Sequence, residues 1–577
     1  MGTTSAVQPA SGQRERFSVV ALFLLLGAGF LLRLRLAWIT FLNPDEALHY
    51  YLAQQPSLKL AYQASLTTAH PPLMIIFLHY WAALGRSELF LRLPFVVAGT
   101  LFCWVMFLWV GKVANHCAAW FALALFAFSP PLISLSAEIR QYAFLLVFCA
   151  CCLYFLERAV NQSLAKEMAL SAVFLWLALL THYSAVIFAI AIGFYALISF
   201  LRRRVPSSVA AVWLAGQVIA LAICAVLFKS QISKLRQLGV PSEIAATWLR
   251  GSIFHPGEDH LLTFVWSKSL RLFRYFFSNG TIGLFGWLLF LLALVLLFSK
   301  WRKANSKDGR GARELAGLLL LPFVITLCVA IAGIYPYGGT RHDVLLAMFA
   351  LPAIAIGLDY TPINLRLSNW LKAALLGCAL LVGNFFPSPT GPYIRPRNQR
   401  RELMREALNS LPPNSIIFTD DQGSMVLNYY LCGESMALPF ASQQQSFLRL
   451  RCGNHDVLVA SGTQAGFDRA RFPALLANTW QELKSSYLLY LFQSGWIDDK
   501  EEEWRTELRR SGGVPTNFGA NILICPITQG AVPYPLDLSL TEGQMTHKQT
   551  LFVMVMLGKP GESRRTSQLK AFDPDLP

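Results

Sequence analysis

The sequence FSVVALFLLLGAGFLLRLRLAWI, residues 17–39, decides the fold class, because a predominantly apolar run of roughly 20 residues crosses a bilayer as one helix. The apolar core of a cleaved signal peptide is shorter, roughly 7 to 15 residues, so we expect residues 17–39 to remain as a membrane span. Arg33 and Arg35 lie near its C-terminal end. Their long side chains are expected either to reach toward water or to face other helices.

The same apolar character recurs along the chain. Of its 577 residues, 55% are hydrophobic and only 14% are charged, against about 25% charged in soluble domains. Further spans are predicted near residues 93–111, 118–134, 142–157, 168–182, 184–201, 208–228, 281–299, 315–334, 343–358 and 371–386. The sequence therefore predicts a polytopic α-helical membrane protein with about eleven transmembrane helices.

The net charge of +16 follows from where the basic residues lie. Lys and Arg cluster in short connections, around Arg14 and Arg16, Lys112, Arg158 and Lys166, Arg202 to Arg204, and Lys300 to Arg313. This positive-inside pattern predicts that these segments face the cytoplasm and that the alternate connections are extracytoplasmic. The predicted partner of the basic residues is the lipid bilayer, and we expect no nucleic acid.

The predicted spans define two regions. Residues 1–386 form the multi-span module, with two long extracytoplasmic connections at residues 40–92 and 229–280. Within them, Leu73 to Leu84 and Leu261 to Phe277 have the pattern of helices that lie along the membrane interface or re-enter the protein. The string PSPTGP, residues 387–392, ends the last span, and we expect residues 387–577 to form an extracytoplasmic soluble domain.

In this C-terminal region, short apolar strand patterns alternate with helix patterns, which predicts a small α/β layer domain. We expect strands at 416–419, 457–460, 487–492 and 521–525, and helices at 400–410, 425–431, 470–483 and 500–510. No glycine-rich nucleotide motif follows these strands. We predict that this domain binds or shields an acceptor. Whether Cys432 and Cys452 form a disulfide stays an open question at the level of the sequence.

Asp45 and Glu46 are two adjacent carboxylates at the point where the chain leaves the first span. A transferase that acts on a hydroxyl needs a base near the acceptor. We assign Asp45 as the base and Glu46 as the residue that organises a cation or a neighbouring Arg or His. The alternative is that the pair caps a helix that begins after Asn43-Pro44.

A phosphate leaving group needs fixed positive charge, and two polar clusters on the same predicted side provide it. Arg140 follows Glu138 at the mouth of a span. The string YPYGGTRH, residues 335–342, combines Tyr337, two glycines, Arg341 and His342 in what resembles a phosphate clamp. The alternatives are a local ion pair or snorkelling for Arg140, and a simple connecting turn for residues 335–342.

Three further residues on this side are candidates for substrate binding or support. His70 precedes two prolines, Tyr142 opens a span, and His182 lies between two spans. The alternatives are a loop stiffened by Pro71-Pro72 and a histidine satisfied within its own turn. His255, Glu258, Asp259 and His260 fit no metal template, so we interpret them as solvated loop charge.

Four strings together resemble the family 39 branch of the C-type (GT-C) glycosyltransferases, which includes dolichyl-phosphate-mannose protein mannosyltransferases and bacterial aminoarabinose transferases. They are Leu32-Arg33-Leu34, Asp45-Glu46-Ala47, His70-Pro71-Pro72-Leu73 and Glu138-Ile139-Arg140-Gln141-Tyr142-Ala143. Thr181-His182-Tyr183 and Tyr335 to His342 are similar to the bacterial branch. The resemblance covers about residues 15–360 and does not extend to the C-terminal domain.

The resemblance implies a polyprenyl-phosphate-linked sugar donor, a catalytic Asp at position 45 and inversion by direct displacement. It also implies a multi-pass protein of a bacterial inner membrane, with Arg341 as the phosphate contact. A divalent metal near the carboxylates is left open, as is the acceptor, which is a lipid, a glycan or a protein. The rival interpretations are a transporter or flippase of lipid-linked sugars, and a non-catalytic envelope assembly subunit.

Overall fold

The computed structural model describes residues 11–203, 205–237, 239, 241–242, 245, 249–299, 307–360, 369–387, 400–419, 421–432, 447–460, 489–494, 516–519 and 522–527. The chain forms two compact units. The bundle unit consists of Met1–Ala37, Arg92–Cys224 and Thr247–Ile394, and the sheet unit consists of Trp38–Leu91, Ala225–Ala246 and Arg395–Pro577. The sheet unit therefore joins the first long connection to the C-terminal region.

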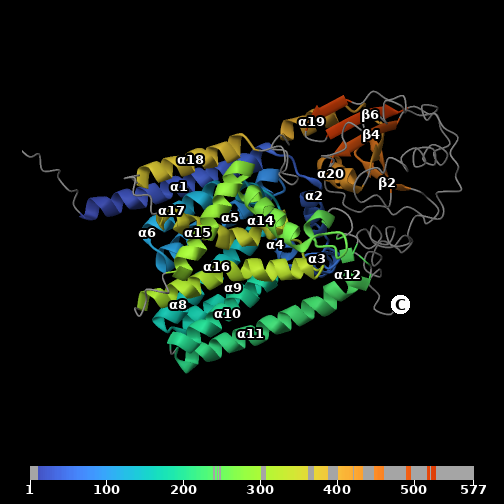
Figure 1. Cartoon of the computed structure of the whole chain (residues 1–577). Coiled ribbons are helices and arrows are strands. Elements are labelled where there is room, and N and C mark those ends of the chain that lie inside the picture. Colours follow the sequence, from blue (N-terminus) through green and yellow to red (C-terminus); the bar gives the residue numbers. More distant parts are fainter. Residues whose placement is uncertain are drawn as a thin grey trace, which may run out of the picture. The chain divides into compact units, whose positions relative to one another are not determined.

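The apolar segments form the helices of the bundle unit, drawn from blue to yellow in Figure 1. They are α1 (Ser11–Ile39), α5 (Glu88–Val113), α6 (His116–Phe128), α7 (Pro130–Ser136), α8 (Tyr142–Gln162), α9 (Ala165–Leu179), α10 (Ala185–Arg203), α11 (Ser207–Leu227), α14 (Leu261–Phe277), α15 (Gly280–Ser299), α16 (Lys307–Ile331), α17 (Ala347–Tyr360) and α18 (Asn369–Phe385). Two 3-10 turns, η2 (Arg250–Ser252) and η4 (Arg341–Leu346), complete it. Each of the predicted spans is helical, and the polytopic helical fold is confirmed.

Length separates these helices into two groups. Among the described residues, 8 helices are long and apolar enough to cross a membrane, or up to 9 if the bent pair α6 and α7 counts as one span. The predicted spans near 168–182 and 371–386 are shorter, because α9 has 15 residues and α18 has 17. α9 packs along α8, so its apolar side chains face a neighbouring helix for much of its length.

The bend of 56° between α6 and α7 has a covalent cause. Pro130 and Pro131 lack N–H groups, so the carbonyls of Phe126 and Ala127 lose their helical donors. Arg33 replaces those donors: its Nη1 donates to the Ala127 carbonyl at 2.9 Å and its Nη2 donates to the Phe126 carbonyl at 3.0 Å. Arg33 is 1% exposed, so it faces other helices and does not snorkel to water.

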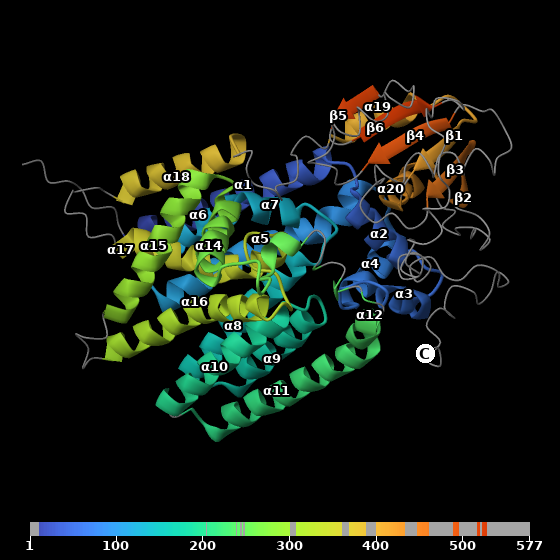
Figure 2. The ribbon, with the colours of Figure 1, turned by 45° about the vertical axis from the view of Figure 1, so that its right-hand side comes forward.

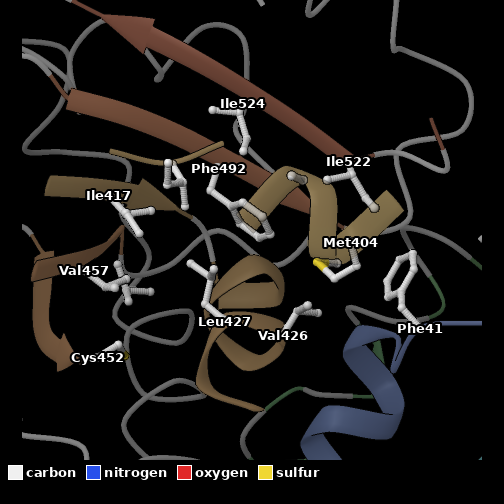
Figure 3. Packing of buried hydrophobic residues seen from close by; sticks show 13 residues of the cluster. Phe41, Met404, Ile417, Val426, Leu427, Cys452, Val457, Phe492, Ile522 and Ile524 are labelled. Carbon is white, nitrogen blue, oxygen red and sulfur yellow. The ribbon is translucent and has the colours of Figure 1, made fainter. Parts of the chain in front are cut away.

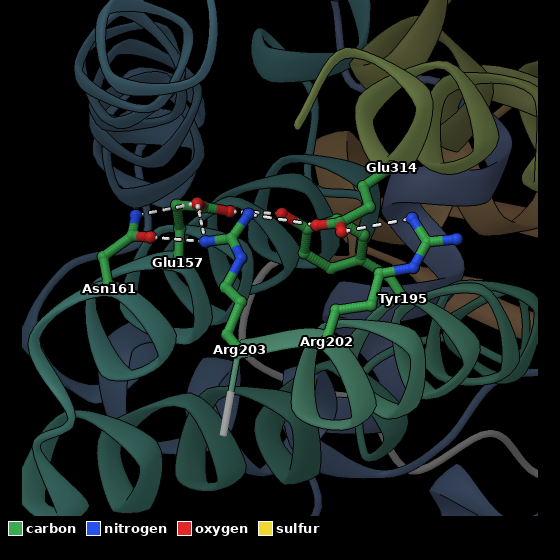
Figure 4. Close-up of polar contacts among 6 residues, drawn as sticks. All are labelled: Glu157, Asn161, Tyr195, Arg202, Arg203 and Glu314. Atoms are coloured by element: carbon green, nitrogen blue, oxygen red, sulfur yellow. Dashed lines mark hydrogen bonds and ion pairs between the residues drawn. The ribbon is translucent and has the colours of Figure 1, made fainter. Parts of the chain in front are cut away.

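A polar network closes one end of the bundle unit, where the predicted basic connection at residues 202–204 begins (Figure 4). Glu314 of α16 pairs with Arg203 at 3.0 Å and with Arg202 at 3.3 Å. Tyr195 donates to Glu157 at 2.6 Å, so α8, α10 and α16 are tied together. α8 rises about 1.5 Å per residue, so Glu157 lies roughly 22 Å along the helix from Tyr142 at its start.

The sheet unit contains short helices and a mixed sheet (Figure 2). Its helices are α2 (Pro44–Ala53), α3 (Leu58–Ser65), α4 (Leu73–Leu84), α12 (Ser233–Gln237), α19 (Arg401–Asn409) and α20 (Asp421–Leu431), with a π-helical turn η1 (Phe228–Ile232). Its strands are β1 (Ile416–Thr419), β2 (Phe447–Cys452), β3 (His455–Ala460), β4 (Leu489–Ser494), β5 (Thr516–Gly519) and β6 (Ile522–Ile527). The order is β2-β3-β1-β4-β6-β5, with β1 parallel to both of its neighbours.

One face of the sheet packs against α19 and α20 (Figure 3). The residues of this core alternate along the strands, as the period of two requires, and they are Ile417, Val457, Val459, Phe492, Ile522 and Ile524 with Met404, Val426 and Leu427 from the helices. Their neighbours Phe418, Leu458 and Leu491 are also buried. Burial on both faces is typical of a central parallel sheet.

The predicted α/β domain is confirmed, with two additions. β2 and β5 were not predicted; both are edge strands, and edge strands carry a weaker apolar signal because one side has no strand partner. Cys432 and Cys452 form a disulfide, which settles a question that the spacing left open. The helices predicted at 470–483 and 500–510 lie outside the described residues.

Candidate active site

α2 begins immediately after Asn43, and the local sequence explains why. The side chain of Asn43 accepts from the Glu46 N–H at 3.2 Å, and the Asn43 N–H donates to Glu46 Oε2 at 3.1 Å. These reciprocal bonds form a capping box, with Pro44 in the first turn. Glu46 is fully buried and fixes the start of the helix. This is the capping role that the sequence analysis gave as the alternative.

Asp45 lies in the first turn of α2, between the two capping residues. Negative charge is favourable at a helix N-terminus, where backbone N–H groups point outward. Because Glu46 and Asn43 fix the backbone on both sides, the position of Asp45 is set by the cap. Glu46 thus organises Asp45 through the helix start.

His49 joins this group, although the sequence reading did not select it. It lies four residues after Asp45 and therefore on the same face of α2. Its buried ring is 6.0 Å from the ring of His70. The interval of four residues between Asp45 and His49 was the available signal. The sheet unit thus brings the predicted residue His70 beside His49, an imidazole on the helix that carries Asp45.

The loop that carries His70 is held by a single buried amide, that of Gln231. Gln231 Nε2 donates to the carbonyls of Thr68 at 2.5 Å, His70 at 2.9 Å and Ser65 at 3.2 Å. Gln231 lies in η1, the π-helical turn that follows α11. Such turns are rare and are frequently found at functional sites. No sequence signal indicated Gln231, because its partners are more than 160 positions away.

In the bundle unit, four of the predicted residues form a second group. The Tyr142 ring lies 5.4 Å from His182 and 6.3 Å from His342, and the Arg140 guanidinium is 5.6 Å from the centre of the Tyr142 ring. They come from the junction of α7 and α8, from the turn between α9 and α10, and from η4. Glu138 lies at the same junction, where it accepts from Ser134 at 3.3 Å.

Tyr142 occupies the centre of this group. Its hydroxyl is buried and has no hydrogen-bond partner among the described residues. A buried hydroxyl without a partner costs free energy, on the order of 1 to 3 kcal/mol. Arrangements of this kind mark a place where a further polar group binds.

His182 is held as a neutral imidazole. The Ser184 N–H donates to His182 Nδ1 at 3.1 Å, so Nδ1 is an acceptor and the ring proton belongs on Nε2. Burial, and secondarily the charge of Arg140, lowers the pKa of His182 to about 3. His182 is therefore satisfied within its turn at Nδ1, while its Nε2–H is a donor.

The glycine loop before η4 is organised around Asp343. The backbone N–H groups of Gly338, Gly339 and Thr340 all donate to Asp343 Oδ2, at 3.2, 3.0 and 3.0 Å. The backbone amides of this loop thus bind the protein's own carboxylate. Arg341 is the first residue of η4, and its role as a phosphate contact stays a prediction.

Packing against α14 explains the two glycines. Gly339 has φ +82, and a Cβ there would lie 2.6 Å from the Arg271 carbonyl oxygen. Tyr337 fastens the same loop: its N–H donates to the Ser252 carbonyl at 2.7 Å, and its hydroxyl lies 2.9 Å from Ser269 Oγ. Burial raises the pKa of Tyr337 to about 12. Tyr337 therefore supports the loop as a neutral hydroxyl.

α14 also contributes two cations that the sequence reading missed. Lys268 and Arg271 are three residues apart on one helix face, and Lys268 packs its stem beside Gly338. Burial, and then the charge of Arg271, lowers the pKa of Lys268. The amphipathic pattern of Leu261 to Phe277 indicated a helix. Only the packing of this helix against the glycine loop shows that Lys268 and Arg271 lie beside the loop that precedes Arg341.

A metal centre was left open by the sequence. Within the described part of the chain, no group of three or more His, Cys, Asp or Glu residues is placed to hold a metal ion.

The fold is that of a multi-span membrane protein, with a capped carboxylate in the sheet unit and clustered cations in the bundle unit. A model of the family "Dolichyl-phosphate-mannose-protein mannosyltransferase" matches residues 69–228. The predicted resemblance to the C-type glycosyltransferases is thereby confirmed. No curated protein matches the chain.

Three solved structures are similar to this chain over most of its length, at low sequence identity. ArnT from Cupriavidus metallidurans in the apo state is 11% identical, over 90% of this chain and 100% of that one, with a TM-score of 0.49. The same protein bound to undecaprenyl phosphate is 14% identical, over 92% and 100%, with a TM-score of 0.49. The oligosaccharyltransferase AglB from Archaeoglobus fulgidus, with an inhibitory peptide and a dolichol-phosphate, is 11% identical, over 90% and 75%, with a TM-score of 0.42.

Proposed function

We propose that this protein is an inverting membrane glycosyltransferase that moves a sugar from a polyprenyl phosphate to an extracytoplasmic acceptor. The observation that carries the proposal is Asp45, held in the first turn of α2 by the Asn43 and Glu46 cap directly after a membrane span. The family matched over residues 69–228 supports the donor class, since its description names a dolichyl-phosphate sugar.

In the proposed reaction, Asp45 accepts the proton of an acceptor hydroxyl. The hydroxyl oxygen attacks the anomeric carbon, and the bond between that carbon and the phosphate oxygen breaks. The electron pair leaves with the polyprenyl phosphate, and one direct displacement inverts the anomeric configuration. His49 and His70 line the same side of α2 and are placed to bind the sugar or the acceptor.

The phosphate is assigned to the bundle unit. Arg341 binds the departing phosphate, and Arg140 adds positive charge, with Lys268 and Arg271 as further cations. Asp343 already satisfies the loop amides, so side chains rather than the backbone have to supply the recognition. Tyr142 and the Nε2–H of His182 are additional donors for the phosphate or the sugar.

The positive-inside pattern supports an assignment of membrane sides. If the basic segments face the cytoplasm, as we infer, counting spans assigns the end of α1, the start of α8, the turn after α9 and the loop before η4 to the opposite side. We propose that this side is extracytoplasmic and that the membrane is a bacterial inner membrane. The acceptor is a lipid, a glycan or a protein hydroxyl at that surface.

The test is sugar transfer in membranes, from a panel of radiolabelled polyprenyl-phosphate sugars. Asp45→Asn should reduce transfer by a factor on the order of 10² to 10⁴, the usual effect of losing a general base. Glu258→Gln is the matched control, because Glu258 is exposed and its carboxylate lies 2.7 Å from the exposed guanidinium of Arg250. Equal transfer by Asp45→Asn and wild type would overturn the proposal.

A further inference from the structure

A tyrosine hydroxyl of the C-terminal domain contacts the segment that leads into α2. Tyr430 of α20 accepts from the Leu42 N–H at 2.8 Å and donates to the carboxylate of Glu88. Leu42 directly precedes Asn43, the cap of α2. A tyrosine hydroxyl has one proton to donate, so these two bonds use Tyr430 in a single orientation.

Glu88, the first residue of α5, is itself held from the C-terminal domain. Arg401 of α19 lies 3.4 Å from Glu88 Oε2, and both side chains are largely buried. The Arg401 guanidinium also lies 4.5 Å from the centre of the Trp38 ring. Pairs that combine charge and hydrogen bonds away from water are stronger than exposed ion pairs. The C-terminal domain thus contacts residues that precede the first turn of α2 in the sequence and a residue that follows it.

Apolar packing follows the same path. Phe41 is 1% exposed and belongs to the hydrophobic core of the sheet, together with Met404 and Val426 (Figure 3). The Tyr429 ring meets the Tyr50 ring edge-on at 5.1 Å, one and a half turns further along α2. The residues before and after Asp45 therefore pack against the C-terminal domain.

From these contacts we propose that the C-terminal domain is the platform that positions Asp45, with Tyr430 as the positioning residue. The sequence predicted another role for this domain, to bind or shield an acceptor. The platform role rests on the proposed function. Loss of the Tyr430 hydroxyl frees the Leu42 N–H and changes the backbone path into the cap. Small displacements of a reacting group can lower rates by about 10²-fold.

The first experiment compares Tyr430→Phe with wild type in the full-length protein. We expect kcat to fall about 10- to 100-fold while KM for the donor stays within about twofold, because the phosphate-binding side chains are unchanged. Tyr490→Phe is the matched control: Tyr490 lies on β4 and packs against the same core. It should retain the wild-type kcat, and thermal unfolding of both variants reports whether the domain is intact.

A second measurement separates positioning from general damage. If Tyr430 acts through Asp45, then Tyr430→Phe should lower transfer in the wild-type background but not further reduce the residual transfer of Asp45→Asn. Glu88→Gln keeps an acceptor for Tyr430 and should lose less activity than Glu88→Ala. This graded response is required even if Tyr430→Phe lowers the unfolding temperature.

The outcomes distinguish the two proposals. Full transfer by Asp45→Asn would reject the proposed function itself. Inactive Asp45→Asn with fully active Tyr430→Phe would reject only the platform. Equal proportional losses from Tyr430→Phe in both backgrounds would also reject it, since the hydroxyl would then act independently of Asp45.

Discussion

At the scale of single residues, two buried groups show how this protein handles polarity inside a membrane module. Asp343 is surrounded by three backbone N–H groups and the Thr340 hydroxyl, so its carboxylate is satisfied within its own loop. His182 is satisfied at Nδ1 by Ser184. Both observations assign each residue a structural partner within its own loop or turn.

The neutral state of His182 makes stability depend on pH. Its folded pKa of about 3 lies below the unfolded value of 6.5, so the unfolded chain binds the proton more readily. The stabilisation is present above about pH 6.5 and is lost as pH falls toward about 3. Between about pH 7 and about pH 5 the loss is about 2 kcal/mol.

We therefore expect His182→Gln to weaken the decline of the thermal midpoint between about pH 7 and about pH 5. Thermal unfolding in detergent across this pH range measures it. His116→Gln is the control, because His116 lies at the start of α6 and its ring contacts Trp120 near the surface. An identical pH dependence for His182→Gln and wild type would contradict the neutral buried state.

At the scale of elements, η1 connects α11 to the loop at residues 65–70. Its five residues bring Gln231 onto the carbonyls of Thr68, His70 and Ser65, of which the last also accepts from the Thr68 N–H at 3.3 Å. An α-helical continuation would rotate Gln231 away from this loop, because each residue turns the helix by about 100°. The π turn thus determines which side chain is buried.

Gln231→Leu should release the loop, because it removes the amide and leaves buried carbonyls without donors, at a cost of roughly 1 to 3 kcal/mol. We expect faster hydrogen exchange in residues 65–70, and about tenfold lower transfer if His70 supports catalysis. Gln55→Leu, a part-buried Gln on the same connection, is the control. Unchanged exchange in residues 65–70 would show that Gln231 does not hold them.

At the scale of the whole molecule, the disulfide relates the sheet unit to its compartment. Cys432 and Cys452 are separated by 20 positions and join α20 to β2. Disulfides persist in oxidising compartments, which agrees with the extracytoplasmic location proposed for this unit. Closing a loop of this size stabilises the folded state by about 3 kcal/mol in the chain-entropy model.

Cys432→Ser combined with Cys452→Ser should therefore lower the thermal midpoint of the protein by several degrees. Reduction of the wild type should produce the same shift, and it should leave the double variant unchanged. In intact cells, a membrane-impermeant maleimide should label both cysteines only after reduction. Labelling without reduction would contradict the bridge and remove this support for the compartment.

Some of this organisation was predictable because it is local. Each span was found from a run of apolar residues, and the cap of α2 was visible as an alternative in Asn43, Pro44 and Glu46. The central strands at 416–419 and 457–460 were also found, since buried strands are marked by apolar runs. Propensity, capping and burial act over a few residues, so one sequence is enough to detect them.

The contacts that define the candidate site lie far apart in the chain, and the tertiary structure alone decided them. Gln231 on the His70 loop, Tyr430 at Leu42 and Arg33 on the broken α6 are each separated by 90 or more positions from their partners. The sequence by itself determined a multi-span membrane protein with a carboxylate after its first span. Which side chains complete that carboxylate's surroundings depended on packing, because hydrogen-bond partners across a fold follow geometry and have no fixed spacing.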